Sequence, residues 1–419
     1  MLADMFLAAI TALLICSQAQ AFTLKEAVSL ALGKANLLQQ SQADAEKSKA
    51  AVVEARAAFL PSLDVNAAYA YHNENPNFRP YDWDSSAGIL LSENLFDHGV
   101  SIYNFGLARA NRRLVDLQFQ RDRSTTIFST VQFYFDVLRT KQIEELQHKN
   151  TLQVEQVYKL VSSQYRQGMK PRADFLRFQT QYQRSVLAET SAQLDSLHAL
   201  QVLKVYLGLH ENPENFENYL ARPELTKSSE LIFEEDKRKL SLDVRDYTEK
   251  LAKIENFPQL NIFGKWGYGS DTFYHTNKTW NDNDKSFWLA GATFTWNLWD
   301  WGQRSAVVQS AKLDTMKVES QSDFDVRDAH ARISELEQQL KVVQRQFEIS
   351  ENLLKIENES YVLMERAYKE GRSTYLDFST ALSDLLSAQT QKIQIEYQLI
   401  LTGFELNHRR GYLDESTIK

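Results

Sequence analysis

Asn94-Leu95-Phe96-Asp97-His98-Gly99 decides the fold of this chain, because it returns as Asn297-Leu298-Trp299-Asp300-Trp301-Gly302, a step of 203 residues. The same step carries four further residues onto copies: Tyr165 onto Tyr368, Gly168 onto Gly371, Asp174 onto Asp377 and Gly208 onto Gly411. A constant step requires spacers of equal length in both halves, as expected where each spacer is a rigid rod. The chain is therefore interpreted as a tandem duplication.

The spacers predict two very long helices. Residues 100–167 hold no proline and one glycine, Gly106, and residues 303–370 hold neither residue type. A helix of about 68 residues is roughly 100 Å long. One globular core cannot cover such a rod, so each must pack sideways on other helices.

The apolar residues of these rods indicate coiled-coil packing. In the second rod they follow heptad spacing: Ile333, Leu336, Leu340, Val343, Phe347, Leu354, Tyr361, Met364 and Tyr368. In the first rod the heptad spacing holds at Ile127, Val131, Tyr134 and Leu138. It is then shifted at Ile143 and Leu146, which indicates a locally altered supercoil.

Each half also contains two shorter helical stretches of about 35 residues, or roughly 50 Å. They span residues 24–59 and 172–206 in the first half, and 224–256 and 374–410 in the second. Two such helices laid end to end match one long rod, so each half can form a bundle of even thickness.

Four segments alternate with a period of two and predict amphipathic strands. Pro61 and Pro258 open the first strand of each pair, and the return strands span residues 86–96 and 287–298. The last strand carries an apolar side with tryptophans near both ends, as at a bilayer boundary: Trp288, Ala290, Ala292, Phe294, Trp296 and Leu298.

Four strands are too few to close a cylinder, and a sheet in hydrocarbon tolerates no unpaired edge. Three copies would supply twelve strands, enough for a water-filled pore. The alternative is a small soluble sheet that caps a helical bundle, but it leaves the tryptophan-rich faces and the long rods unexplained.

The N-terminus predicts an export signal. Phe6 to Ile15 form a short apolar run, and Ala19-Gln20-Ala21 has the small-x-small pattern of a cleavage site. Cys16, the only cysteine, lies within this signal, so the mature chain is expected to hold no disulfide. No stretch of the expected mature chain is apolar enough for a transmembrane helix.

Neither an enzyme nor a nucleic-acid partner is expected. The net charge is −8, and the basic residues are dispersed among acids along the helices. The eight histidines show no ligand spacing with Cys, Asp or Glu, so we expect no metal site and no cofactor. No nucleophile with a nearby base can be assembled.

Polar residues do converge at the turns after the two rods. Gly168 and Gly371 end helices, and Asp174 and Asp377 follow in the next helix's first turn, where a carboxylate suits the helix dipole. These residues can therefore serve as helix punctuation alone. The functional alternative is that the turns surround a threefold axis, where they form carboxylate rings and a narrow mouth.

The chain resembles the TolC-like outer-membrane efflux family over essentially its whole mature length. The resemblance rests on residues 58–63 (Ala-Phe-Leu-Pro-Ser-Leu), on residues 94–97 and 297–300, and on the Tyr-x-x-Gly turns at Tyr165 and Tyr368. It implies a mainly α-helical homotrimer in the outer-membrane lipid, with a twelve-stranded β-barrel and a periplasmic α-helical tunnel. It also implies two partners, a periplasmic adaptor (membrane fusion) protein and an inner-membrane transporter.

In the well-known members a basic residue and two aspartates follow the second tip glycine and hold the mouth shut. Asp377 matches the first aspartate, but the second falls on Thr380 and the basic position on Ser373. A different bond set is therefore expected at the gate, in which Arg372, Lys170 or Arg172 supplies the positive charge. The gate candidates are Tyr165, Tyr368, Asp174, Asp377 and Arg372. The resemblance assigns adaptor contact to the turns at Gly168, Lys170, Arg172 and Gly371.

The leading hypothesis is a passive exit duct for small-molecule efflux or type I protein secretion. The alternative is a structural coiled-coil protein of the periplasm or surface with a soluble β cap. The predicted organisation is a signal at residues 1–21, repeats at 22–208 and 223–411, a linker at 209–222 and a tail at 412–419.

Overall fold

The computed structural model describes residues 21–72, 82–213, 215–217, 223, 232–254, 257–269, 286–411 and 413–415. Almost all of the predicted export signal lies outside these residues. The predicted hairpin loop at 270–285 also lies outside them, and of the predicted loop at 73–84 only residues 82–84 are described, as part of a strand. The chain divides into two compact units, and each unit takes segments from both repeats. We call Met1–Ser41, Phe119–Phe233 and Arg327–Lys419 the helical unit, and Gln42–Gln118 and Glu234–Val326 the sheet unit.

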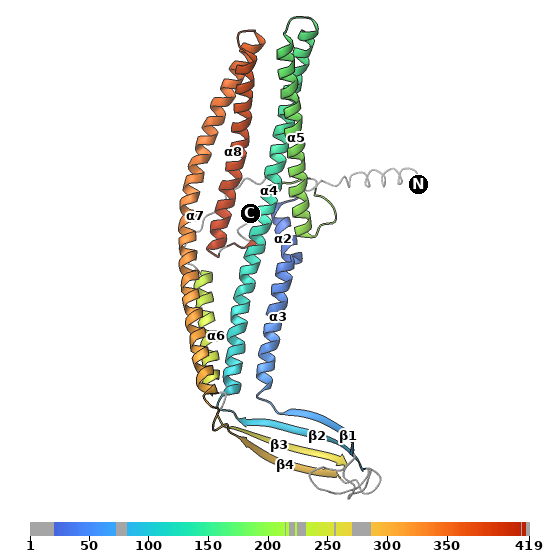
Figure 1. The fold of residues 1–419 in the computed structure, drawn as a ribbon, viewed down its shortest axis with the longest axis vertical. Coiled ribbons are helices and arrows are strands. Elements are labelled where there is room, and N and C mark those ends of the chain that lie inside the picture. The colour runs from blue at the N-terminus through green and yellow to red at the C-terminus, as the bar shows by residue number, and fades with distance from the viewer. Residues whose placement is uncertain are drawn as a thin grey trace, which may run out of the picture. The chain divides into compact units, whose positions relative to one another are not determined.

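The described elements are mostly helices, joined by four strands (Figure 1). They are α2 Leu24–Lys34, α3 Asn36–Ala57, β1 Ser62–His72, β2 Asp82–Phe96, α4 Val100–Arg166, α5 Arg172–Leu207, α6 Ile232–Ile254, β3 Gln259–Gly269, β4 Ser286–Thr295, α7 Gln303–Lys369 and α8 Tyr375–Arg409. None of these helices is both long enough and apolar enough to cross a membrane.

The duplication is visible in the structure. Helices α4 and α7 have 67 residues each, and both of their ends are related by the step of 203. For residues that precede the hairpin loop of each repeat, equivalent positions are 197 residues apart. This step carries the ends of β1 onto the ends of β3, and Ala57 onto Ile254. Even the left-handed backbone positions come in pairs, with φ of 55° at His98 and 56° at Trp301.

Two predicted helices differ from those observed. The stretch predicted as one helix over residues 24–59 breaks at Ala35, which is extended (ψ 127°), into α2 and α3. Gly33 and Asn36 flank the break, and both have low helix propensity. Helix α6 begins at Ile232 rather than at residue 224, and residues 224–231 lie outside the described part.

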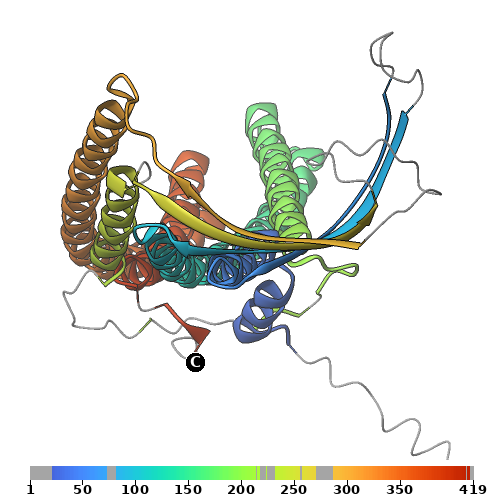
Figure 2. The same ribbon diagram turned by 90° about the horizontal axis from the view of Figure 1, so that it is seen from below.

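The four strands of the sheet unit form one antiparallel sheet in the order β1-β2-β3-β4, and Figure 2 shows its curvature. Both hairpins have the same register, because Ser62 lies opposite Ser92 and Gln259 lies opposite Thr295. Among the described strands, β1 and β4 each have one unpaired edge.

The register places most apolar residues of the four strands on one side, which we call the apolar face, while Leu90, Phe263 and Leu289 lie on the other side. Across this face Val65 lies opposite Ile89, Ile89 opposite Trp266, and Trp266 opposite Trp288. Its side chains are strongly exposed, as shown by Val65 at 78% and Trp288 at 80%. Such a continuous exposed apolar patch marks an interaction surface.

Strand β4 ends at Thr295, three residues before the predicted end at Leu298. The reason lies in the pairing. Residues 94–96 of β2 are strand because they pair with β3 beyond the last residue that β1 reaches. Their copies, residues 297–299, have no such neighbour among the described strands.

The heptad seam predicted in the second rod is buried in the helical unit. Ile333 and Leu336 pack against Leu406 of α8, and Val343 and Phe347 pack against Leu399. In Figure 1 helices α7 and α8 lie side by side, as do α4 and α5. The long helices are therefore held by lateral packing, as their length required.

The largest core cluster joins α2, α4, α5 and α8. Its fully buried members include Leu24, Ile127, Tyr134, Leu203 and Phe404. The Tyr134 hydroxyl lies 2.8 Å from the Phe22 carbonyl oxygen and 3.0 Å from that of Glu217, so this buried polar group is satisfied.

Gly88 is predicted to be intolerant of a side chain. A Cβ there would lie 2.9 Å from the carbonyl oxygen of Trp266 and 3.2 Å from the Cα of Gly267, both of them backbone atoms of β3. We expect Gly88→Ala to cost roughly 1–3 kcal/mol of stability. Gly264→Ala is the matched control, because nothing lies within 4 Å of its added methyl. Urea unfolding midpoints that fall equally in both variants would contradict this prediction.

His408 is predicted to make the helical unit sensitive to acid. Its ring stacks on Phe128 at 5.1 Å and its Nδ1 lies 2.9 Å from the Ser124 hydroxyl. Burial, and then the charges of Arg121 and Arg409, lower the pKa of His408 to about 3. The unfolded chain takes up this proton near pH 6.5 and the folded chain does not, so stability falls as the pH drops below about 6.5.

We expect a loss on the order of 2 kcal/mol between about pH 7.5 and pH 5, measured as a lower Tm. His408→Phe keeps the ring stack and removes the titrating group, so its Tm should vary less with pH, whatever its absolute value. An unchanged pH dependence in this variant would assign the effect to another group.

Candidate functional site: the tip turns

Both long helices end in the same backbone motif. After α4 the amide of Gly168 donates to the Tyr165 carbonyl (3.0 Å), and the amide of Met169 donates to the Gln164 carbonyl (2.9 Å). After α7 the amides of Gly371 and Arg372 repeat these two bonds. The pattern is a Schellman motif, which needs a left-handed residue. Glycine provides it in both turns, with φ of 77° and 70°.

The helices that follow start differently. Helix α5 begins after Pro171, which makes no side-chain cap. Helix α8 begins with a capping box, in which the Asp377 carboxylate accepts from the Thr374 amide (3.1 Å) and the Thr374 hydroxyl accepts from the Asp377 amide (3.3 Å). The hydrogen bonds from Thr374 lower the pKa of Asp377. Asp377 is therefore an ionised helix-start residue, whatever else it does.

Each turn is backed by the same set of aromatic rings. Tyr165 stacks on Phe175 at 5.0 Å, and Tyr368 stacks on Phe378 at 5.2 Å. A second tyrosine approaches each phenylalanine from two turns earlier in the long helix, Tyr158 at 6.0 Å and Tyr361 at 6.1 Å. These rings fix each long helix to its own return helix.

Tyr368 also connects the two turns to each other. The Nζ of Lys170, from the first turn, lies 5.4 Å from the centre of the Tyr368 ring, within range of a cation–π interaction. Phe178 of α5 approaches the same ring at 5.9 Å and the Tyr375 ring at 4.3 Å. The Tyr375 hydroxyl donates to the carbonyl of Arg177 at 3.4 Å.

The predicted gate residues divide into two groups. Burial, and then the Asp174 carboxylate, raise the pKa of Tyr368. Arg372 instead forms an ion pair with Glu370 inside its own turn. Arg172 is exposed and makes no ion pair with any residue in the described part of the chain.

The aromatic partners of the tip were not predicted as site residues. The duplication could have identified four of these residues, because they are also repeated after 203 residues: Tyr158 as Tyr361, and Phe175 as Phe378. Phe178 has no such copy, since the step leads to Ala381. A search for repeated positions therefore cannot find the residue that joins the two hairpins.

A groove of about 270 Å³ lies beside the contact between Tyr375 and Arg177. Its other lining residues are Leu176, Thr180, Gln181 and Arg184. Neither Arg177 nor Arg184 forms an ion pair with a residue that the structure describes, so the groove carries net positive charge.

Comparison with known proteins agrees with this geometry. The family model described as "Outer membrane efflux protein" matches residues 27–209 and 237–406. Outer membrane protein TolC of Escherichia coli (strain K12) is 22% identical, with 91% of this chain and 80% of TolC covered.

Two solved structures show the same fold at low sequence identity. The Campylobacter jejuni CmeC outer membrane channel has a TM-score of 0.83 at 18% identity, covering 94% of this chain and 86% of CmeC. The open state of the Neisseria gonorrhoeae MtrE outer membrane channel has a TM-score of 0.79 at 17% identity, covering 94% and 91%. TolC, CmeC and MtrE are named as outer membrane proteins or channels, and none of the three as an enzyme. Because the family model matches most of the length of this chain, the chain belongs to the outer membrane efflux protein family.

Proposed function

We propose that three copies of this chain form an exit channel in the outer membrane, with a periplasmic extension built from α4, α5, α7 and α8. The channel is a passive conduit of a tripartite efflux or type I secretion system. A periplasmic adaptor protein and an inner-membrane transporter are its partners, and the transporter supplies the energy.

The observation that carries this proposal is the sheet, which has a continuous apolar face and two unpaired edges. In a bilayer every backbone polar group needs a partner, so the edges must be closed by further strands. Four strands from each of three copies give twelve, and a barrel of that size leaves an aqueous lumen.

Planar-bilayer recording tests the channel directly. The purified protein in detergent should insert and give discrete, uniform conductance steps. A structural coiled-coil protein with a soluble β cap would give no conductance steps. Bilayers that contain verified inserted trimers but show no conductance would contradict the proposed channel.

The tip turns are the proposed constriction. Tyr368, Lys170 and Asp174 form the bond set that holds the two hairpins of one copy together, in place of the basic residue and second aspartate of the well-known family members. Support comes from the 5.4 Å cation–π contact and from the Asp174 carboxylate, which contributes to the raised pKa of Tyr368. Tyr165 remains within its own hairpin and supports the turn at Gly168.

We also propose that Asp377 contributes a ring of carboxylates at the mouth, where fixed negative charge favours cations. Asp377→Asn keeps an acceptor for the Thr374 amide and removes the charge. It should therefore reduce the preference of single trimers for cations over anions and weaken block by multivalent cations. Thr374→Ala is the control, since it removes a cap worth about 1 kcal/mol and keeps the charge. Unchanged selectivity in Asp377→Asn would leave Asp377 as a helix-start residue only.

The adaptor is proposed to contact the turns at Gly168, Lys170, Arg172 and Gly371 and the neighbouring groove. Arg177 and Arg184 line that groove, so an adaptor segment with carboxylates at the matching positions fits it. Arg184→Glu should weaken co-purification of the adaptor, and the loss should be larger at low salt than at high salt.

A further inference from the structure

The side of the sheet opposite the apolar face, which we call the inner side, carries a group of large apolar residues. Leu90 of β2, Phe263 of β3 and Leu289 of β4 lie there, although polar residues are expected on a strand side that faces a water-filled lumen. Lys265 of β3 lies between the two leucines, opposite Leu90 on one neighbouring strand and opposite Leu289 on the other. We call these four residues the inner patch.

A glycine on the neighbouring strand makes room for the Phe263 ring. Phe263 lies opposite Gly291 of β4, and a Cβ at Gly291 would be 2.8 Å from the Cζ atom of the ring and 3.1 Å from its Cε1 atom. The ring therefore covers the backbone of β4 at Gly291, one inner position along the strand from Leu289. Phe263 is half-buried and Leu289 is 41% exposed, so both side chains are open to a ligand.

The duplication does not repeat the inner patch. The steps of 197 and 203 relate the pair of Phe263 and Gly291 to the pair of Asn66 and Gly88, so both hairpins share this register. The other equivalent positions are small or polar: Ala68 for Lys265, Ser86 for Leu289 and Thr293 for Leu90. The same strand geometry thus forms with and without large apolar residues on the inner side. The inner patch is therefore not a requirement of the fold.

We infer that the inner patch binds amphiphilic organic anions inside the proposed channel. The acidic group of such a molecule lies at Lys265, and its apolar group lies on Phe263 and Leu289. The inference rests on the proposed channel, because closure of the sheet into a barrel is what makes the inner side the wall of a lumen. It adds a class of cargo and the residues that select it.

The charges on the inner side determine how the cargo is oriented. Lys265 is half-buried, and its cross-strand neighbours are leucines. A cationic side chain among apolar groups suits an anion that carries an apolar part of its own, because the charge and the apolar surface are then both covered. Asp64 lies beyond Leu90 on β1 and repels an anion from that side. The apolar part of the cargo therefore extends toward Phe263 and Leu289, away from Asp64.

The openness of the inner patch suits cargo in transit. Conduction requires a site that attracts cargo and still releases it. The half-buried Phe263 ring and the exposed Leu289 side chain cover one side of a short alkyl chain and leave its other side in water. Binding is therefore weak and quickly reversible, as a passive conduit needs.

Block of single trimers by n-alkyl sulfonates tests the inner patch. Ethyl-, butyl-, hexyl- and octylsulfonate carry the same charge and differ only in the length of the apolar part. In planar bilayers each probe should reduce the current through a trimer. The half-blocking concentration should fall about two-fold for each added methylene, as expected for a chain that is half-covered by apolar surface.

Two variants that install residues of the first repeat separate the two parts of the site. Phe263→Asn installs the residue found at Asn66. It should raise the half-blocking concentration of octylsulfonate about five- to ten-fold and leave that of ethylsulfonate nearly unchanged. Lys265→Ala installs the residue found at Ala68 and should weaken block by all four probes equally, about two- to five-fold. The conductance of the same trimers without probe verifies that each variant inserts as a channel.

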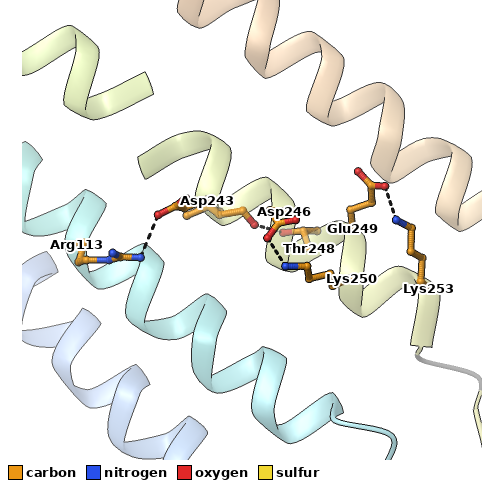
Figure 3. Close-up of polar contacts among 8 residues, drawn as sticks. Arg113, Asp243, Asp246, Thr248, Glu249, Lys250 and Lys253 are labelled. Atoms are coloured by element: carbon orange, nitrogen blue, oxygen red, sulfur yellow. Dashed lines mark hydrogen bonds and ion pairs between the residues drawn. The ribbon is translucent and has the colours of Figure 1, made fainter. Parts of the chain in front are cut away.

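Lys250→Gln is the control for net charge. Lys250 lies on α6, where its ammonium group is 2.6 Å from the Asp246 carboxylate. Figure 3 shows this pair together with the bridge from Arg113 of α4 to Asp243 of α6. The variant removes the same charge as Lys265→Ala and leaves the strands unchanged. Its block by the alkyl sulfonates should therefore match that of the wild type.

The outcomes separate the cargo site from the channel. Conducting trimers that are blocked equally at every chain length, or not at all, would overturn the inner patch and leave the channel proposal standing. Chain-length dependence that persists in Phe263→Asn would do the same, as would such dependence for alkyltrimethylammonium ions and not for the sulfonates. Inserted wild-type trimers without conductance would remove the proposed function itself, and the inner patch with it.

Discussion

Tyr368→Ala is expected to open the tip. The substitution removes the ring that contacts Lys170, Phe178 and Phe378, and so weakens the connection between the two hairpins of one copy. A cation–π contact and an aromatic pair together are worth about 1.5–2 kcal/mol, which shifts the closed-to-open ratio roughly ten- to thirty-fold in each copy. Single trimers in a planar bilayer should show a larger conductance and more time in the open level.

Tyr165→Ala is the matched control, because Tyr165 occupies the copied position and loses an equivalent stack on Phe175. It makes no described ring contact with the second hairpin, so its conductance should stay close to wild type. If both variants open the channel equally, the stacks within each hairpin hold the tip closed, and the proposed role of Tyr368 is wrong.

Ile89→Arg is expected to prevent stable insertion in the outer membrane. Ile89 lies at the middle of β2 on the apolar face, opposite Val65 and Trp266. An arginine facing lipid near the bilayer midplane costs about 2–4 kcal/mol per copy, and a trimer carries three of them. The variant should be depleted from the outer-membrane fraction and should form few heat-modifiable trimers.

Leu90→Arg is the control at the same depth on the other face. Leu90 lies opposite Asp64 and Lys265, so the new charge would face the proposed lumen and one existing carboxylate. This variant should still insert and should change ion selectivity instead. Failure of both variants to insert would indicate that the two faces of the sheet are not distinct.

Much of the fold could be predicted from the sequence, because rigid spacers fix distances along the chain. The 203-residue step predicted where α4 and α7 begin and end. The heptad spacing predicted the buried seam from Ile333 to Phe347. The break at Ala35 was missed, since Gly33 and Asn36 weaken a helix without forbidding it.

The end of β4 and the contact of Phe178 at the tip could not be predicted, for a different reason. Whether residues 296–298 are strand depends on a neighbouring strand, not on their own alternation. Likewise Phe178 meets Tyr368 only because two hairpins, 203 residues apart in sequence, are brought together, whereas Lys170 was among the cations expected at the gate. Arg372 was predicted as a gate residue from its position, and the structure pairs it with nearby Glu370.

The mass of the purified mature protein, measured by light scattering with and without detergent, tests the central claim most directly. The proposed channel predicts a complex of three chains that stays in solution only while detergent covers the apolar face. A single chain that is stable and monodisperse in plain buffer would contradict it.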